Sequence, residues 1–216
     1  MASLDKKALY AITYGLFVLT AKEGEKDNGC IVNTVQMLTS DPTRVVVFVN
    51  KSNYTEQMIS RTGVFNVSIL QKNTPFALFK HFGFQSGKDV DKFAGRVYPR
   101  SENGLYYIYE NANAFLSCKV VGEHDYGTHT LFVGEVIEGK VLSSQKSLSY
   151  EQYLTDVKPK PQAAEKPKAA SGGKAEEPKT EKWVCKVCGY VHEGPLPDDF
   201  ICPWCKHPAE DFEKIS

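Results

Sequence analysis

The hydrophobic pattern of residues 1–157 is typical of short strands rather than of long helices. Its apolar runs are brief, and several alternate between apolar and polar positions with a period of two. Such runs predict half-buried or fully buried strands. They lie at 9–20, 45–49, 64–70, 114–121 and 130–137. Strands at this spacing, with few helices between them, predict a mainly β fold that is closed or partly closed into a barrel.

Turn residues separate the apolar runs and leave room for only a few helices. The turn signals are Gly24, the Asp-Asn-Gly of 27–29, the Asp-Pro of 41–42, the Asn-Gly of 103–104, Gly127 and Gly139. A helix is predicted to start after Ser52 and Asn53, which are good caps, and to end at Arg61. Two further short helices are predicted near 75–81 and 150–157.

Charge and hydropathy exclude two classes of partner. The longest charge-free run near the start, residues 8–21, has 14 residues, which is too short for a membrane span. We interpret it as a core strand rather than a secretory signal, because it contains Tyr10, Thr13 and Gly15 and lacks a small-residue cleavage pattern. The 26 basic and 26 acidic residues cancel, which argues against nucleic-acid binding by bulk attraction. We therefore expect a cytoplasmic protein with neither a membrane nor a nucleic acid as partner.

Residues 158–182 have the composition of a linker. They include four Pro and two Gly but no aromatic and no branched aliphatic side chain, so they bury too little apolar surface to offset the entropy of ordering. A flexible tether of 25 residues has a root-mean-square span of about 28 Å. The sequence thus predicts three parts: a domain at 1–157, the linker at 158–182 and a small domain at 183–216.

The small domain carries four of the six cysteines in two C-x-x-C pairs. These are Cys185 with Cys188, and Cys202 with Cys205. Each pair can direct two thiolates at one ion, and two pairs complete a tetrahedral site of four sulfurs. Because 34 residues cannot form a sufficient core, the metal must contribute folding energy. Spacing alone leaves a structural zinc ribbon and an iron site equally open.

Residues around the cysteines carry a resemblance that separates these metals. The segments CKVCGY and PDDFICPWC closely resemble those of the rubredoxin family. That resemblance implies one iron on four cysteines, which carries one electron, with zinc as an alternative occupant. Lys206 stands where rubredoxins usually have Gly. This departure affects the expected hydrogen bonds to sulfur, and hence the potential, rather than the ligation.

The other two cysteines are expected to have no chemical role. Cys30 and Cys118 lie 88 positions apart within apolar strand patterns. We interpret them as buried thiols rather than a disulfide, because four metal-binding thiolates indicate a reducing compartment.

One segment of the first domain has the chemistry of a phosphate site. Asn50, Lys51 and Ser52 lead into a predicted helix whose first-turn amides lack partners, and Thr55 follows. A helix N-terminus beside a lysine and hydroxyl groups favours a phosphate. An ordinary strand, loop and capped helix would give the same pattern. The sequence contains no Gly-rich phosphate loop and no dinucleotide fingerprint.

Motifs across nearly the whole first domain decide between these interpretations. The segments TYGLFVLTAKEGEKDNGCIVNTVQMLTSDP, VNKSNYT, FKHFGFQSGKDVDKF and GTHTLFVGEV resemble the flavin reductase-like family, which has an FMN-binding split barrel. The resemblance implies a homodimer with FMN near the subunit interface and a loop at 82–93 over the site. Its Phe82, Phe84 and Phe93 are either a lid or core. The implied contacts are Asn33, Thr34, Gln36 and Met37 at the isoalloxazine ring, Thr39 near the ribityl chain, Asn50, Lys51, Ser52 and Thr55 at the phosphate, and His129 near the flavin or an incoming nicotinamide.

The two domains together resemble the flavin- and rubredoxin-containing electron carriers of anaerobes. That resemblance implies electrons that arrive from a reduced nicotinamide, usually through a separate reductase, pass through FMN and the iron, and leave to a terminal acceptor such as a flavodiiron oxygen or nitric oxide reductase. Two alternatives stay open. The chain is itself an NAD(P)H-dependent flavin or rubredoxin reductase, or the small domain is a zinc ribbon for partner docking and only the barrel is redox active.

Overall fold

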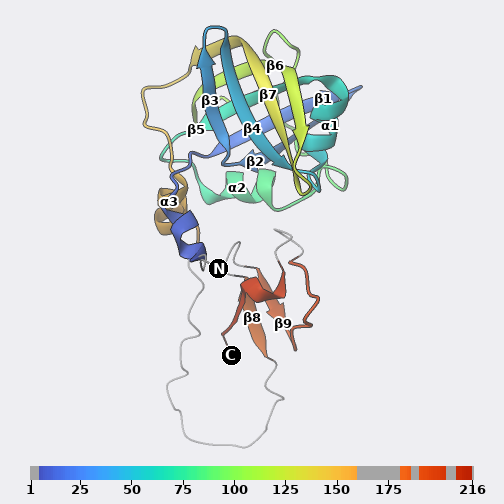
Figure 1. The fold of residues 1–216 in the computed structure, drawn as a ribbon, viewed down its shortest axis with the longest axis vertical. Coiled ribbons are helices and arrows are strands. Elements are labelled where there is room, and N and C mark those ends of the chain that lie inside the picture. The colour runs from blue at the N-terminus through green and yellow to red at the C-terminus, as the bar shows by residue number, and fades with distance from the viewer. Residues whose placement is uncertain (1–4, 160–180, 186–189, 203–207, 216) are drawn as a thin grey trace, which may run out of the picture. The chain divides into compact units, whose positions relative to one another are not determined.

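A computed structural model describes residues 5–159, 181–185, 190–202 and 208–215 (Figure 1). The chain divides into two units, residues 1–158 and 159–216. The first unit is built on a sheet of seven antiparallel strands in the order β2-β1-β5-β6-β7-β4-β3. The strands are β1 (Phe17–Glu23), β2 (Lys26–Val32), β3 (Val35–Ser40), β4 (Thr43–Asn50), β5 (Val64–Leu70), β6 (Ala112–Asp125) and β7 (His129–Val141).

Short helices cover the sheet without interrupting it. They are a 3-10 helix at Lys6–Ala11, α1 (Tyr54–Thr62), α2 (Phe76–Gly83) and α3 (Tyr150–Gln152), which continues as a π-helical turn at Tyr153–Val157. The three predicted helices are confirmed to within two residues at each end. Asn53 is the N-cap of α1, although its side chain makes no capping hydrogen bond. None of the helices that the structure describes is long and apolar enough to cross a membrane.

Alternating side chains from the strands fill a core inside the curled sheet. In β4, Val45, Val47 and Val49 are buried, whereas Phe48 between them is 40% exposed. Side chains from both ends of the sheet, including Cys30 of β2, belong to the same buried cluster, together with Met58 and Ile59 of α1. The mainly β fold and its barrel-like closure, predicted from the strand spacing, are therefore confirmed.

A second core lies outside the barrel, against β1 and β5. Val18 and Leu70 point outward from these strands into a cluster formed by α2, the segment 84–111 and the π-helical turn. Phe82 and Phe93 belong to this cluster and are 2% and 6% exposed. The structure thus assigns both phenylalanines to the core rather than to a lid.

The outer face of β3, β4 and β7 has no such cover among the described residues. Leu38, Phe48 and Tyr126 are all exposed there, whereas Met37, although 66% exposed, pairs with buried Val45 and so lies on the other face of the sheet. The rings of Phe48 and Tyr126 lie 6.4 Å apart. Other segments of the chain therefore cover one half of the barrel, and exposed apolar side chains lie on the other half.

Three of the predicted strand and turn positions are wrong. Residues 9–20 are not one strand, because Lys6–Ala11 is a 3-10 helix and β1 begins only at Phe17, where β2 and β5 supply partners. Asp-Asn-Gly at 27–29 is not a turn but lies inside β2, and the hairpin turn is at Gly24, with φ 57°. A Cβ on Gly29 would lie 3.2 Å from Phe82, so this glycine serves packing rather than turning. Gly139 likewise lies within β7.

We expect Gly134→Ala to destabilise the barrel because β7 passes close to a core ring. A Cβ at this position would lie 2.5 Å from Phe65 Cζ and 3.0 Å from Cys118 Cβ. Overpacking of this kind costs about 1–3 kcal/mol. Urea unfolding of the variant should show this loss. Gly122→Ala is the matched control, since its nearest heavy atom would lie 3.4 Å away; equal stability of the two variants would contradict the packing argument.

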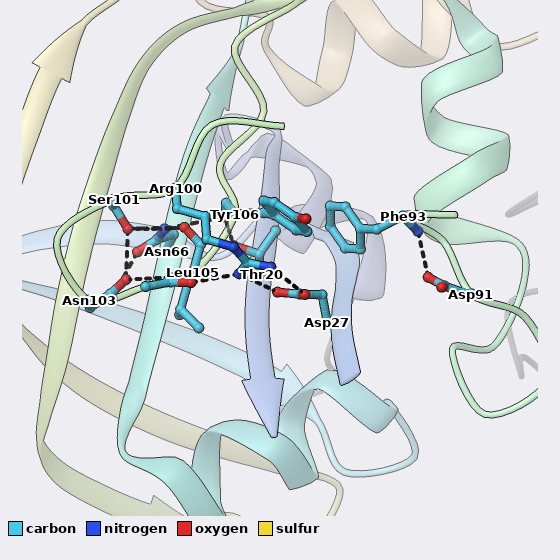
Figure 2. A network of polar contacts seen from close by, with 11 residues as sticks. Thr20, Asp27, Asn66, Asp91, Phe93, Arg100, Ser101, Asn103, Leu105 and Tyr106 are labelled. Carbon is cyan, nitrogen blue, oxygen red and sulfur yellow. Dashed lines mark hydrogen bonds and ion pairs between the residues drawn. The ribbon is translucent and has the colours of Figure 1, made fainter. Parts of the chain in front are cut away.

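Arg100 fastens the segment 99–107 to the sheet (Figure 2). Its guanidinium makes a bidentate ion pair with Asp27 at 2.9 and 2.8 Å and lies 3.6 Å from the ring centroid of Tyr106. Asn66 of β5 is fully buried and donates to Ser101 Oγ at 2.7 Å and to the Leu105 carbonyl at 3.1 Å. These contacts join a long connection to strands on both sides of β1.

The second unit is a small three-stranded sheet. Its order is β10-β8-β9, with β8 at Lys182–Cys185, β9 at Val191–Glu193 and β10 at Phe212–Lys214, and a 3-10 helix at Ala209–Asp211 precedes β10. Phe200 stacks on Tyr190 at 6.5 Å and meets Phe212 edge-on at 5.3 Å. The predicted linker falls largely outside the described residues.

Candidate functional site

The end of β4 and the turn between β6 and β7 lie side by side. Asn50 is opposite His129 in the β4–β7 register, and Lys51 N donates to the Thr128 carbonyl at 3.0 Å. Asn50 Oδ1 accepts from Ser52 N at 2.9 Å, which folds the chain into α1. The side chains of Asn50, Lys51 and Ser52 are exposed. The structure therefore collects three predicted phosphate residues and His129 at one rim of the barrel.

An ion pair crosses this rim. Lys51 Nζ lies 2.5 Å from Asp125 Oδ2, and Asp125 Oδ1 accepts from Gly127 N at 2.7 Å. The pair raises the pKa of Lys51 and lowers the pKa of Asp125, mainly through their hydrogen bond. Asp125 was not among the residues predicted from the sequence. Its position two residues before Gly127 marks it as a turn residue, but the turn pattern alone predicts only where a strand ends.

His129 stands at the first position of β7. Its Nδ1 is 2.9 Å from the hydroxyl oxygen of Thr128, and the side chain is half-buried. Within the described part of the chain, the imidazole therefore lies beside the segment 50–52 with Thr128 rather than a carboxylate as its hydrogen-bond partner. Its proposed contact with flavin or nicotinamide stays a prediction.

Thr55 is placed differently from the prediction. Its side chain is fully buried in α1, where its hydroxyl oxygen accepts from Asn28 Nδ2 at 3.0 Å. The helical turn that exposes Ser52 directs Thr55 toward β2, so Thr55 is not available to a phosphate at the rim.

The residues around β3 fall into two groups. Asn33 and Thr34 are half-buried just before the strand, and Thr34 Oγ1 donates to the Phe48 carbonyl at 2.6 Å, near the Asn50 end of β4. Gln36 is exposed, as is Met37.

Thr39 falls at the other end of β3. It pairs with Arg44, and its hydroxyl donates to the Pro42 carbonyl at 2.5 Å. Asn50 lies six positions after Arg44 in β4, about 20 Å along the strand. A ribityl chain is far shorter, so Thr39 does not lie between a ring at Thr34 and a phosphate at Asn50 of the same protomer.

Polar groups lie close to Cys30 in the interior of the barrel domain. Lys92 is 3% exposed, and its Nζ donates to the carbonyls of Gly29 at 2.8 Å and Phe82 at 2.9 Å. Burial lowers the pKa of Lys92 and raises the pKa of Cys30. Cys118 is also buried, and burial raises its pKa to about 12. Neither cysteine is in a disulfide, which confirms the prediction for both.

We expect Lys92 to make stability depend on alkaline pH. Its folded-state pKa lies below the ordinary value of 10.5, so in the window between the two values the unfolded chain binds more protons. Lys92 therefore contributes a rise in stability with pH through that window, whereas the raised pKa values of Cys30 and Cys118 contribute a fall. Lys92→Met should remove this rise, as measured by urea unfolding at several pH values. The exposed Lys80→Met should keep it, and an unchanged profile in Lys92→Met would contradict the assignment.

Two of the predicted metal ligands are described, and both are buried. Cys185 ends β8 and is 1% exposed, and Cys202 is 0% exposed. Cys188 and Cys205 lie outside the described residues, as does Lys206. Within the described part of the chain no three metal-binding side chains converge. Two buried sulfurs on separate segments fit a soft, thiolate-bound metal, and the backbone of Cys185 pairs with Tyr190 and Phe212.

Comparison with known proteins agrees with both sites. The profile of the flavin reductase like domain matches residues 9–155, and that of the rubrerythrin, rubredoxin-like domain matches residues 183–213. The chain therefore belongs to the flavin reductase-like family and carries a rubredoxin-like domain behind it. Over nearly its whole length it is similar to the high molecular weight rubredoxin of Moorella thermoacetica, with 35% identity over 98% of this chain and 100% of the relative.

Two further similarities concern the barrel alone. The ferric-chelate reductase (NAD(P)H) of Archaeoglobus fulgidus is 39% identical over 69% of this chain and 89% of its own length. The flavoredoxin structure from Methanosarcina acetivorans superposes with a TM-score of 0.57 at 25% identity and covers 65% of this chain and 74% of that chain. The two domain profiles and the full-length relative, together with these barrel matches, support a flavin cofactor for the barrel and an iron cofactor for the small domain. They also support electron transfer between flavin and rubredoxin centres.

Proposed function

We propose that the protein carries electrons from a reduced nicotinamide, delivered through a separate reductase, to a terminal acceptor of the flavodiiron type. FMN would occupy the barrel, and iron would be held by Cys185, Cys188, Cys202 and Cys205. When bound, a flavin accepts two electrons as a hydride and releases them singly, and a four-thiolate iron carries one. The observation that carries the proposal is the presence of both site types in one chain.

The residues of the rim would bind and orient the flavin. Lys51 and Ser52 would hold the phosphate, with Asn50 fixing the Ser52 backbone at 2.9 Å. Asn33, Thr34, Gln36 and Met37 would lie along the ring. Exposed Met37 and the half-buried Thr34 leave a surface with both apolar and polar contacts.

The uncovered half of the barrel supports a homodimer. Phe48, Tyr126 and Leu38 form an exposed apolar face on β3, β4 and the β6–β7 turn, and this face includes the rim at Asn50. A second copy would cover these side chains and enclose the flavin from the other side. The four thiolates further favour a reducing compartment, and we propose the cytoplasm.

A second candidate function is direct reduction by NADH or NADPH. It is favoured by the similarity to a ferric-chelate reductase (NAD(P)H) and by the position of His129 at the same rim as Lys51. In this version the protein is an NAD(P)H-dependent flavin or rubredoxin reductase and needs no upstream enzyme.

Anaerobic spectroscopy with flavin and metal analysis tests the proposal. We expect one FMN and one iron per chain, with iron–thiolate absorbance superposed on that of the flavin. Stopped-flow mixing with NADH or NADPH then separates the two functions, because the carrier bleaches slowly until a reductase is added. Rapid bleaching by nicotinamide alone would favour the second function. A preparation that holds only zinc under iron-replete expression would leave the barrel as the sole redox centre. It would refute the carrier and the rubredoxin reductase and leave only a flavin reductase.

A further inference from the structure

Asp125 faces the ammonium of Lys51 from the β6–β7 turn. The two side chains are 61% and 41% exposed, so a ligand that approaches Lys51 from solvent meets the carboxylate as well. The second carboxylate oxygen is fixed by Gly127 N at 2.7 Å. Asp125 thus has one contact within its own turn and one across the rim.

A second carboxylate also acts on Lys51 but is held elsewhere. Glu56 contributes to the raised pKa of Lys51 through charge. Its side chain is 6% exposed, and its Oε1 accepts from Thr130 Oγ1 at 2.6 Å. The contact with Thr130 keeps Glu56 in the interior. A ligand can therefore displace Asp125, rather than Glu56, from the Lys51 ammonium.

We propose that Asp125 determines specificity at the flavin site by competing with the ligand's phosphate for the Lys51 ammonium. This inference rests on the proposed function, because it takes residues 50–52 as the phosphate edge. A phosphate must displace the carboxylate or share the ammonium with it, and the two anions repel each other. A dianionic phosphate ester gains more from the ammonium than a singly charged ligand does. A flavin without a phosphate neither gains from Lys51 nor suffers from Asp125.

Replacement of Asp125 by Asn isolates this charge effect. The amide oxygen of Asn can still accept from Gly127 N, so the turn keeps its hydrogen bond while Lys51 loses its anionic partner. We expect flavin-depleted full-length Asp125→Asn to bind FMN about twofold to fivefold more tightly than the unaltered chain at low salt. The gain should shrink at high salt, and riboflavin affinity should not change. Quenching of flavin fluorescence measures both dissociation constants.

Two matched variants complete the test. Asp125→Glu keeps the negative charge and should bind FMN as the unaltered chain does. Asp41→Asn removes an exposed charge at the opposite end of β4 and should change nothing. Unchanged or weaker FMN binding by Asp125→Asn, with FMN still preferred over riboflavin, would overturn the inference alone. Equal affinity of the unaltered chain for FMN and riboflavin would overturn the phosphate edge itself.

Discussion

Cys202→Ser should yield a protein that keeps its flavin and loses its iron. Cys202 is completely buried and lies on a different segment from Cys185 of β8, and a hydroxyl is a poor ligand for a soft metal. Because 34 residues cannot form an independent core, loss of the metal should also unfold residues 183–216. The iron–thiolate absorbance should vanish, and amide signals from the small domain should collapse to unfolded positions.

The barrel supplies the control for this experiment. Cys30→Ser replaces a thiol that is also buried but belongs to the first unit, where it lies beside Thr55 and Lys92. This variant should keep full iron absorbance. If Cys202→Ser retained that absorbance, the assignment of Cys202 as a ligand would be refuted.

Combined replacement of Lys51 by Met and Ser52 by Ala should weaken FMN binding by about thirtyfold or more, since it removes a charge-assisted and a hydroxyl contact to the phosphate. Riboflavin, which has no phosphate, should bind the double variant as it binds the unaltered chain. Equilibrium dialysis or fluorescence quenching gives both affinities. The ratio of the two losses distinguishes a missing phosphate contact from a damaged barrel.

A charge-matched control exists on the same sheet. Lys140→Met removes an exposed ammonium near the C-terminal end of β7, whereas His129 begins that strand. It should bind both flavins normally. Unchanged FMN affinity in the double variant would mean that the phosphate lies away from residues 50–52, and the homodimer geometry would then need revision as well.

The sequence pattern predicted those barrel strands that bury one or both of their faces. β4, β5, β6 and β7 all follow runs recognised in the sequence, because alternation reports burial directly. β2 and β3 were missed for non-local reasons. Asp-Asn-Gly reads as a turn, and only the ring of Phe82, which is 53 positions away, explains a glycine inside β2. β3 leaves Gln36, Met37 and Leu38 exposed, so its pattern carries no sign of burial.

The candidate sites were predictable to the extent that spacing defines them. Two C-x-x-C pairs specify four sulfurs without knowledge of the fold. At the rim, Lys51 and Ser52 were found because they precede a helix, but the direction of Thr55 depends on the helical turn that points it at Asn28. Asp125 was found only from the structure, because its partner Lys51 lies 74 positions earlier in the chain.

The two end strands of the large sheet are finished differently. At β2, Lys92 donates to the Gly29 carbonyl and the ring of Phe82 packs against Gly29. Arg100 also forms an ion pair with Asp27 of this strand (Figure 2). β3 is the other edge strand, and no comparable side-chain contacts cover it among the described residues. Among the described strands of the large sheet, β3 is thus the edge open to strand addition. One self-complementary edge can pair with the same edge of a second copy about a two-fold axis, but it leaves no free edge from which a fibre could grow.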